Sequence, residues 1–326
     1  MPPKLIIQLG RFVWTTLWRV MMSKLAPRDR SGAYVRPVSE FRDQIGSQNY
    51  PAAKGRYKLW VGMGCPWAHR TLVVRALKGL EDTISVSIVS PSPENGGWIL
   101  NAPEFGCETL AELYRLAKPG YKGRSTVPVL WDCETNTIVN NESSEIIVML
   151  NAEFNQFARN PNLDLYPTNL QEKIDNWNDK TYNAVNNGVY RCGFAQTQEA
   201  YNTACEELFN TLDEIEATLQ TNRYLCGEAL TLADVRLFTT LLRFDTVYYS
   251  LFKCSRCRIQ DYANLGAYLR DIYQLPGVAD TCDLQAIKQD YYGNLFPLNP
   301  GGIVPIDTEL NLLAPHERAK LTASVY

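Results

Sequence analysis

The stretch VGMGCPWAHR, residues 61–70, places a cysteine directly before a proline, where a strand pattern gives way to a helix pattern. Proline suits the first turn of a helix, so Cys65 is expected at a helix N-terminus. Unpaired backbone N–H groups and the helix dipole favour a thiolate at that position. We therefore predict that Cys65 is a nucleophile whose pKa lies below that of a free thiol, rather than one more buried cysteine.

The residue three positions after Cys65 is Ala68, and it restricts the possible chemistry. A dithiol oxidoreductase carries its second thiol at that position, where it attacks the mixed disulfide that the first thiol forms. The sequence Cys-Pro-Trp-Ala lacks this thiol, so an external thiol must resolve Cys65, and glutathione is the abundant one in the cytosol. The sequence thus predicts monothiol chemistry on glutathione mixed disulfides or thioethers.

Two later segments suit a tripeptide thiol. In STVPVL, residues 125–130, the proline after Val127 can be cis, which leaves the Val127 backbone to pair with an extended peptide. In NNESSE, residues 140–145, Glu142 offers an anion for an α-amino group, and Ser143 begins a helix whose N–H groups suit a carboxylate. Each signal is common by itself, but here they follow the Cys-Pro pair in order.

The apolar patterns supply a scaffold for these residues. Strand patterns cover residues 56–62 and 83–89, with a helix between them that begins at Pro66 and ends near Gly79. A strand pair within 126–141 then precedes a helix at 142–151. The order β-α-β followed by β-β-α is the thioredoxin arrangement. Residues 90–125, with one short helical patch, look like an insertion.

The second half of the chain shows only helical periodicity after about residue 160, so we expect an all-α domain there. Thr231 and Asp234 have the spacing of a capping box at the start of one of these helices. The predicted organisation is an N-terminal helix and connector over 1–50, a thioredoxin-like domain over 51–155 and a helical domain over 160–326. The helical patterns cover residues 169–190, 198–220, 231–252 and 264–274.

The first thirty residues form an amphipathic helix pattern whose apolar run is interrupted by Gln8, Arg11, Arg19 and Lys24. This segment is a poor spanning helix and lacks the cleavage site of a signal peptide. We expect it to pack on its own protein or on a partner subunit, and a membrane surface is the less favoured alternative.

Charge and cysteine content limit the partners. A net charge of −3 and a pI of about 5.6 argue against a nucleic-acid groove. The nine cysteines are odd in number and lack the spacing of a disulfide framework. We therefore expect a cytoplasmic protein whose thiols are reduced. Cys254 and Cys257 have the spacing of half a zinc site, but no second pair follows, so no metal is expected.

Several longer strings narrow the interpretation: CPWAHR, GRSTVPVLWD, IVNNESSEII, RLFTTLLRFDTVYY and YYGNLFPLNPGGIVP. Over residues 33–307 they resemble the glutathionyl-hydroquinone reductases, the Xi class of glutathione transferases. The resemblance implies a thioredoxin-like domain followed by a helical domain, glutathione as co-substrate and a homodimer. The sequence GMG before Cys65 is a departure, because many members carry bulkier residues there.

The resemblance also implies roles for individual residues. Cys65 would be the nucleophile, and glutathione would be held by Trp98, Arg124, Val127, Glu142 and Ser143. The quinol would lie against Tyr190, Arg243, Tyr248 and Tyr292, with Tyr190 and Tyr292 as first choices for the catalytic proton donor and Arg243 beside a phenolate-like oxygen.

The expected function is glutathione-dependent removal of glutathione from glutathionyl-hydroquinones through a Cys65–glutathione mixed disulfide. Two alternatives remain at this point. One is an Omega-like thiol transferase or dehydroascorbate reductase that uses the same cysteine. The other is a non-enzymatic binding module with the transferase fold, docked by its N-terminal helix.

Overall fold

The computed structural model describes residues 3–92, 94, 97–306 and 310–322. Its described strands form one six-stranded sheet in the order β4-β3-β2-β1-β5-β6. The central strands β1 and β2 are parallel, and every other neighbouring pair is antiparallel. The strands are β1 (Tyr57–Val61), β2 (Ser85–Ser92), β3 (Gly97–Glu104), β4 (Cys107–Thr109), β5 (Val129–Asp132) and β6 (Thr137–Asn140).

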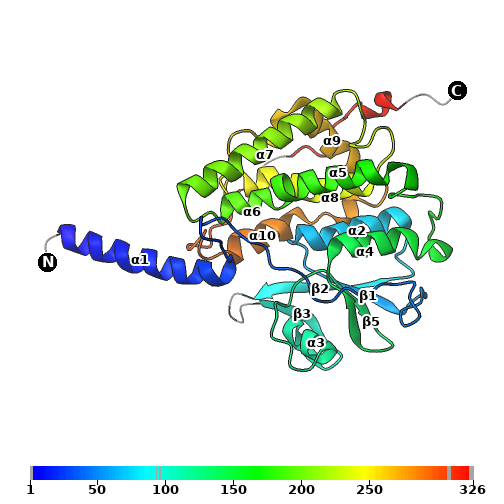
Figure 1. Ribbon diagram of the computed structural model, residues 1–326, viewed down its shortest axis with the longest axis horizontal. Coiled ribbons are helices and arrows are strands. Elements are labelled where there is room, and N and C mark those ends of the chain that lie inside the picture. The colour runs from blue at the N-terminus through cyan, green and yellow to red at the C-terminus, as the bar shows by residue number, and fades with distance from the viewer. Residues whose placement is uncertain (1–2, 93, 95–96, 307–309, 323–326) are drawn as a thin grey trace.

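Two helices cover the face of the sheet that carries the expected site. α2 (Pro66–Lys78) joins β1 to β2, and α4 (Ser143–Ala152) follows β6. They pack against each other and lie between the sheet and the remaining helices, whereas α3 (Leu110–Ala117) covers the opposite face (Figure 1). The predicted thioredoxin arrangement is confirmed, including the end of α2, where Gly79 adopts a left-handed conformation with φ of 65°.

Residues 90–125 are more regular than we expected, because they contain β3 and β4 in addition to α3. These two strands continue the sheet beyond β2. Most of their residues are at least partly exposed. Exposed strands of this kind carry little of the apolar alternation on which a sequence-based prediction depends.

The second half is helical, as predicted, and α2 packs on α8. The expected capping box is present, since the Asp234 carboxylate accepts from the backbone N–H and the hydroxyl of Thr231, both at 2.8 Å. The helices are α5 (Gln171–Thr181), α6 (Gly188–Gly193), α7 (Gln198–Leu219), α8 (Leu232–Arg243), α9 (Ala263–Tyr273) and α10 (Leu284–Asn294).

Two of the helical patterns are interrupted by single π-helical turns. One, Tyr182–Asn186, separates α5 from α6, and the other, Phe244–Tyr248, follows α8. A π turn shifts the direction of the side chains that follow it and is frequent at functional sites. Tyr190 lies just beyond the first turn, and Tyr248 ends the second.

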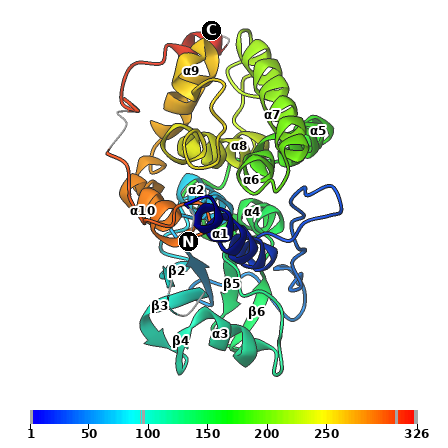
Figure 2. The same cartoon turned by 90° about the vertical axis from the view of Figure 1, so that its left-hand side faces the viewer.

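The sequence did not indicate α10, which the structure places between the sheet and the helical half (Figure 2). Its apolar residues lack a clear helical period, and Lys288 is buried although it is charged. Local pattern therefore could not reveal a helix that, as shown below, supplies two side chains to the site.

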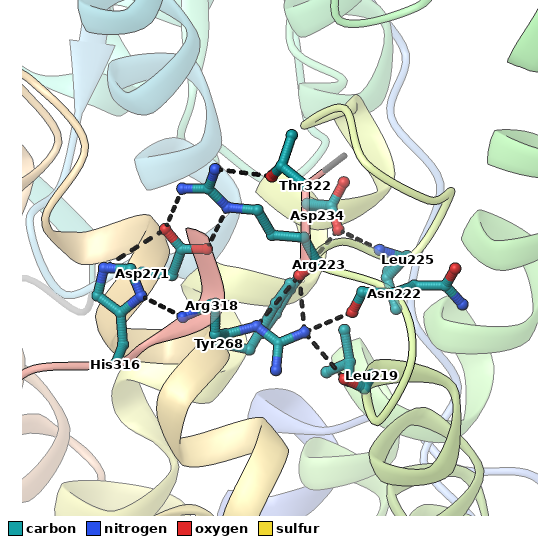
Figure 3. A network of polar contacts seen from close by, with 10 residues as sticks. All are labelled: Leu219, Asn222, Arg223, Leu225, Asp234, Tyr268, Asp271, His316, Arg318 and Thr322. Atoms are coloured by element: carbon teal, nitrogen blue, oxygen red, sulfur yellow. Dashed lines mark hydrogen bonds and ion pairs between the residues drawn. The ribbon is translucent and has the colours of Figure 1, made fainter. Parts of the chain in front are cut away.

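A buried polar network fastens the C-terminal segment to the helical half (Figure 3). Arg318 donates to the backbone carbonyls of Leu219, Asn222 and Arg223, which lie at the end of α7 and otherwise lack helical partners. Arg223 in turn binds both carboxylate oxygens of Asp271 at 2.8 Å. This bidentate contact joins the segment after α7 to α9.

α1 (Pro3–Leu25) is helical as predicted, but most of it extends away from the rest of the protein (Figures 1 and 2). Only its end packs, where Met22 is fully buried and the Trp18 indole donates to the Pro297 carbonyl at 3.1 Å. The expectation that the helix packs on its own protein therefore holds for this last part alone. No helix among the described residues is long and apolar enough to cross a membrane.

Candidate active site

Cys65 lies at the N-terminus of α2, as the sequence predicts. Its backbone N–H donates to the Gly62 carbonyl at 3.0 Å, which closes the turn after β1, and its own carbonyl accepts from His69 at 3.0 Å. The thiol donates to the Val127 carbonyl at 3.6 Å. The peptide bond between Val127 and Pro128 is cis, which confirms that part of the sequence-based interpretation.

The two glycines before Cys65 allow two other segments to approach closely. A Cβ atom at position 62 would lie 2.4 Å from the Trp98 ring, and one at position 64 would lie 2.4 Å from the Asp290 carboxylate. The Gly64 N–H donates to Asp290 Oδ2 at 2.9 Å. The GMG sequence therefore fits a site in which β3 and α10 both touch the loop that carries the cysteine.

Arg243 binds the backbone of this loop. It is fully buried, and its guanidinium donates to the carbonyls of Met63 and Gly64 at 2.9 and 2.8 Å. It also lies 3.1 Å from His69 Nδ1. Burial and Arg243 hold the pKa of His69 well below its usual range, so this imidazole is neutral and accepts. Arg243 does not line the cavity, so its expected position beside the quinol is corrected.

The sulfur of Cys65 experiences opposing effects. Burial raises the pKa of the thiol, whereas the N–H groups of Ala68 and Trp67 and the charges of Arg36 and Arg243 lower it. Burial outweighs the other contributions, so the pKa lies above its usual value. The predicted net lowering is wrong, because the position at the helix N-terminus was recognised but its desolvation was not visible in the sequence.

Two adjoining cavities lie near this cysteine, which lines the first of them. The first, of about 270 Å³, is lined by Cys65, Trp98 and Tyr190, among others. The second, of about 260 Å³, is lined by Glu142 and Ser143 at the start of α4. Arg124 and Val127 border both cavities, as do Arg36 and Trp67. The structure thus brings together all five residues expected to hold glutathione, around a space next to the thiol.

Glu142 is held as an anion within the second cavity. Its carboxylate accepts from the Ser144 N–H at 3.2 Å, from the Ser144 hydroxyl at 2.9 Å and from the Ser39 hydroxyl at 3.1 Å. Burial alone would raise the pKa of Glu142, but these hydrogen bonds and Arg36 together lower it. A fixed, half-buried carboxylate of this kind suits an ammonium group.

Tyrosine hydroxyls lie on the other side of the first cavity. The hydroxyls of Tyr190 and Tyr291 are 2.5 Å apart, and that of Tyr291 is 2.9 Å from the hydroxyl of Tyr248. Tyr190 and Tyr291 line the cavity, whereas Tyr248 is fully buried behind them. Burial and the neighbouring tyrosines raise the pKa of Tyr190 and Tyr291 well above the usual value, so both stay protonated.

The expected position of Tyr292 is corrected by one residue. Its hydroxyl donates to the Thr246 carbonyl at 3.2 Å and does not line the cavity; Tyr291 takes that place. Successive residues on a helix point about 100° apart, and of these two adjacent tyrosines on α10 only Tyr291 lines the cavity. The sequence YYG contains no signal that distinguishes them.

Two further residues at the site were missed in the sequence. Arg36, from the connector after α1, lies with its guanidinium 3.8 Å from the Trp67 ring centre. Asp290 lines the first cavity, and burial raises the pKa of its carboxyl to about 6 against the opposing effects of the Gly64 N–H and Arg243. Neither Arg36 nor Asp290 stands in a recognisable motif. Among the described residues, no cluster of three or more His, Cys, Asp or Glu could hold a metal ion.

The raised pKa of Cys65 is testable by alkylation. We expect the iodoacetamide reaction of Cys65, followed by peptide mass spectrometry against pH, to have its midpoint above the value of about 8.5 for a free cysteine. Arg36→Gln should move the midpoint further upward, because the guanidinium is one of the groups that lower the pKa. Lys54→Gln, an exposed charge elsewhere, is the matched control. An alkylation step at low pH that disappears in Cys65→Ser would instead show that the pKa of Cys65 is lowered.

Comparisons with known proteins agree with this geometry. The family described as "Glutathione S-transferase, N-terminal domain" matches residues 64–153, and "Glutathione S-transferase, C-terminal domain" matches residues 198–271. The chain is 44% identical to the glutathionyl-hydroquinone reductase YqjG of Escherichia coli, over 95% of this chain and 98% of that protein.

Two solved structures show the same fold. The glutathione-bound structure of YqjG from Escherichia coli has 46% sequence identity and a TM-score of 0.82, and the match covers 86% of this chain and 96% of that one. The Xi glutathione transferase of Phanerochaete chrysosporium has 45% identity and a TM-score of 0.84, with coverage of 88% and 96%. The chain therefore belongs to the glutathione transferases, in their Xi class of glutathionyl-hydroquinone reductases.

Proposed function

We propose that this protein removes glutathione from glutathionyl-hydroquinones, consuming a second glutathione and releasing the hydroquinone and glutathione disulfide. One observation carries the proposal: Cys65 and the paired hydroxyls of Tyr190 and Tyr291 line one cavity, next to a second cavity suited to a peptide. Ala68, buried in α2, supplies no resolving thiol. The name of the Escherichia coli relative supports the same reaction.

We assign the binding of glutathione to the residues around the second cavity. Glu142 would receive the α-ammonium group, and Ser143 with the N–H groups at the start of α4 would receive the neighbouring carboxylate. The backbone of Val127 would pair with the cysteinyl residue, which places its sulfur next to Cys65. Trp98 and Arg124 would hold the remaining part of the tripeptide.

The first chemical step needs both a thiolate and a proton. The Cys65 thiolate attacks the sulfur of the substrate, a sulfur–sulfur bond forms, and the bond from sulfur to the ring carbon breaks. The electron pair of that bond stays on the carbon, which must receive a proton as the hydroquinone leaves. Tyr190 and Tyr291 are protonated and can polarise the ring oxygen through hydrogen bonds while the carbon accepts its proton.

We propose that Asp290 transfers this proton. Its carboxylate lines the cavity beside Cys65, and its pKa of about 6 leaves it mainly ionised at neutral pH. It can therefore take the proton of the Cys65 thiol and deliver it to the leaving carbon. In the second step the glutathione thiol loses a proton, attacks the mixed disulfide as a thiolate and regenerates the Cys65 thiolate. The proton released there returns Cys65 to the thiol.

We also propose that the protein is a homodimer in the cytoplasm, as the resemblance to its class implies. The nine cysteines are all free, which is consistent with a reducing compartment. An Omega-like thiol transferase would use the same cysteine but would not need hydroxyl groups at the substrate ring. A non-enzymatic module would not need a thiol aligned with a peptide cavity.

The proposed activity is tested with glutathionyl-menadiol. The protein should release menadiol when glutathione is present. When free glutathione is withheld, intact-protein mass spectrometry should show one glutathione on Cys65, because no second thiol lies at position 68.

Cys65→Ser should lose both the turnover and the adduct, whereas Cys133→Ser, at the end of β5, should keep both. An internal disulfide in place of the adduct would contradict the monothiol mechanism. Efficient reduction of dehydroascorbate without release of menadiol would favour the Omega-like alternative.

The adjacent tyrosines of α10 form a matched pair. We expect Tyr291→Phe to lower kcat on glutathionyl-menadiol by roughly ten- to a thousandfold, because loss of one hydrogen-bond donor to a developing oxyanion typically costs about 10²–10³. Reduction of hydroxyethyl disulfide should be spared, because its leaving group is already a stable thiolate. Tyr292→Phe should affect neither substrate and should cost only about 1 kcal/mol of stability, from its bond to Thr246. Equal losses on both substrates would make Tyr291 a structural residue.

The assignment of Asp290 predicts a pH profile. As the pH falls through about 6 the carboxylate becomes protonated and can no longer accept the thiol proton, so kcat should fall on the acid side. Asp290→Asn should remove this limb and lower kcat at neutral pH by about a hundredfold. Asp283→Asn is the matched control: it should keep the limb, shifted to lower pH because Asp283 helps to raise this pKa. A limb that survives in Asp290→Asn would assign it to another group.

A further inference from the structure

α1 exposes an apolar surface that no other described residue covers. A helix of 23 residues stands off the fold (Figures 1 and 2). Most of its side chains are exposed. Apolar surface of this extent on one element indicates an interaction site. The apolar side chains that are between 46% and 70% exposed are Leu5, Ile6, Ile7, Leu9, Phe12, Val13, Trp14, Leu17 and Val20.

The charges on α1 all have one sign. Lys4, Arg11 and Arg19 recur with Gln8 and Thr15 at intervals of three and four residues, so they form one narrow stripe along the helix. The sequence has no acidic residue before Asp29, and the rest of the chain is therefore more acidic than the overall net charge of −3. A complementary surface for this helix is an anionic one.

The width of the apolar face indicates the kind of surface. A helix that pairs with a second helix needs a narrow apolar seam, whereas here apolar residues occupy nearly everything outside the basic stripe. Two copies of α1 would still leave much of this face in water. Immersion at a lipid interface covers it all, with the basic stripe at the headgroups. Arg11 and Arg19 interrupt the apolar run, so the helix suits lying in the interface rather than crossing it.

We propose that α1 binds the surface of an anionic phospholipid bilayer. Its last residue, Leu25, lines the cavity that holds Cys65, so docking keeps the mouth of that cavity at the base of the lipid-bound helix. Apolar quinols partition into the same interface. The inference that the docked protein meets its quinol substrate at the bilayer rests on the proposed function. The inference that α1 binds the bilayer does not.

The test is co-sedimentation of the full-length protein with vesicles of phosphatidylcholine and phosphatidylserine. We expect binding that weakens as salt is added and that is lost on vesicles of phosphatidylcholine alone. Arg11→Gln with Arg19→Gln should lower the partition coefficient about 25-fold, about fivefold for each charge removed. Val13→Gln with Leu17→Gln should abolish binding. The matched control, Lys54→Gln with Arg256→Gln, removes two exposed charges elsewhere and should bind as the wild type does.

Release of menadiol from soluble glutathionyl-menadiol serves as the folding control, and all three double variants should retain it. The proposal is overturned if the wild-type protein does not sediment with the anionic vesicles. It is equally overturned if binding is independent of Arg11 and Arg19, or if Val13→Gln with Leu17→Gln changes the oligomeric state in gel filtration instead, which would assign the helix to a second copy of the chain. Loss of menadiol release with vesicle binding intact would count against the proposed function alone.

Discussion

The site depends on one buried cation. Arg243 belongs to α8 in the helical half, yet its guanidinium donates to the carbonyls of Met63 and Gly64, in the loop that leads from β1 to Cys65. Removing a guanidinium from water is costly unless its N–H groups are satisfied, and here the carbonyls and a neutral His69 satisfy them. The position of the sulfur is therefore fixed by a residue more than 170 positions away in the sequence, which couples the two halves of the chain.

Burial determines which groups at the site are protonated at neutral pH. Burial raises the pKa values of Cys65, Tyr190 and Tyr291, so all three are protonated when the surrounding solution is neutral. Asp290 differs, because burial raises the pKa of its carboxyl only to about 6. At that value a small change of environment decides whether the carboxyl is charged. A thiol that is not ionised at rest and a carboxylate that can accept its proton form a coherent pair. The alternative of a permanently ionised thiolate would require less burial around the sulfur.

The same loop shows why glycine is required before the cysteine. Glycine at positions 62 and 64 removes side chains where the Trp98 ring and the Asp290 carboxylate already occupy the space. A bulkier residue at either position would displace β3 or α10 from the loop. The identity of the residues before the cysteine is thus linked to the elements that form the walls of the cavity.

The sequence by itself determined the parts that are local. The Cys-Pro pair, the strand before it and Gly79 after the helix specify the position of Cys65 and the length of α2, because caps and turns depend on a few adjacent residues. The cis proline after Val127 and the capping box at Thr231 were predictable for the same reason. The resemblance to the Xi class then identified the residues around the peptide cavity.

Tertiary structure decided everything that depends on direction and on burial. Whether Tyr291 or Tyr292 lines the cavity follows from the rotation of α10, which packing sets and the sequence YYG does not reveal. The sign of the pKa shift at Cys65 depends on how many atoms surround the sulfur, and these come from segments distant in sequence. The same holds for the exposure of α1. Its amphipathic pattern was visible in the sequence, but only the folded chain shows that most of its apolar face has no partner within the described protein, because burial is a property of the whole arrangement.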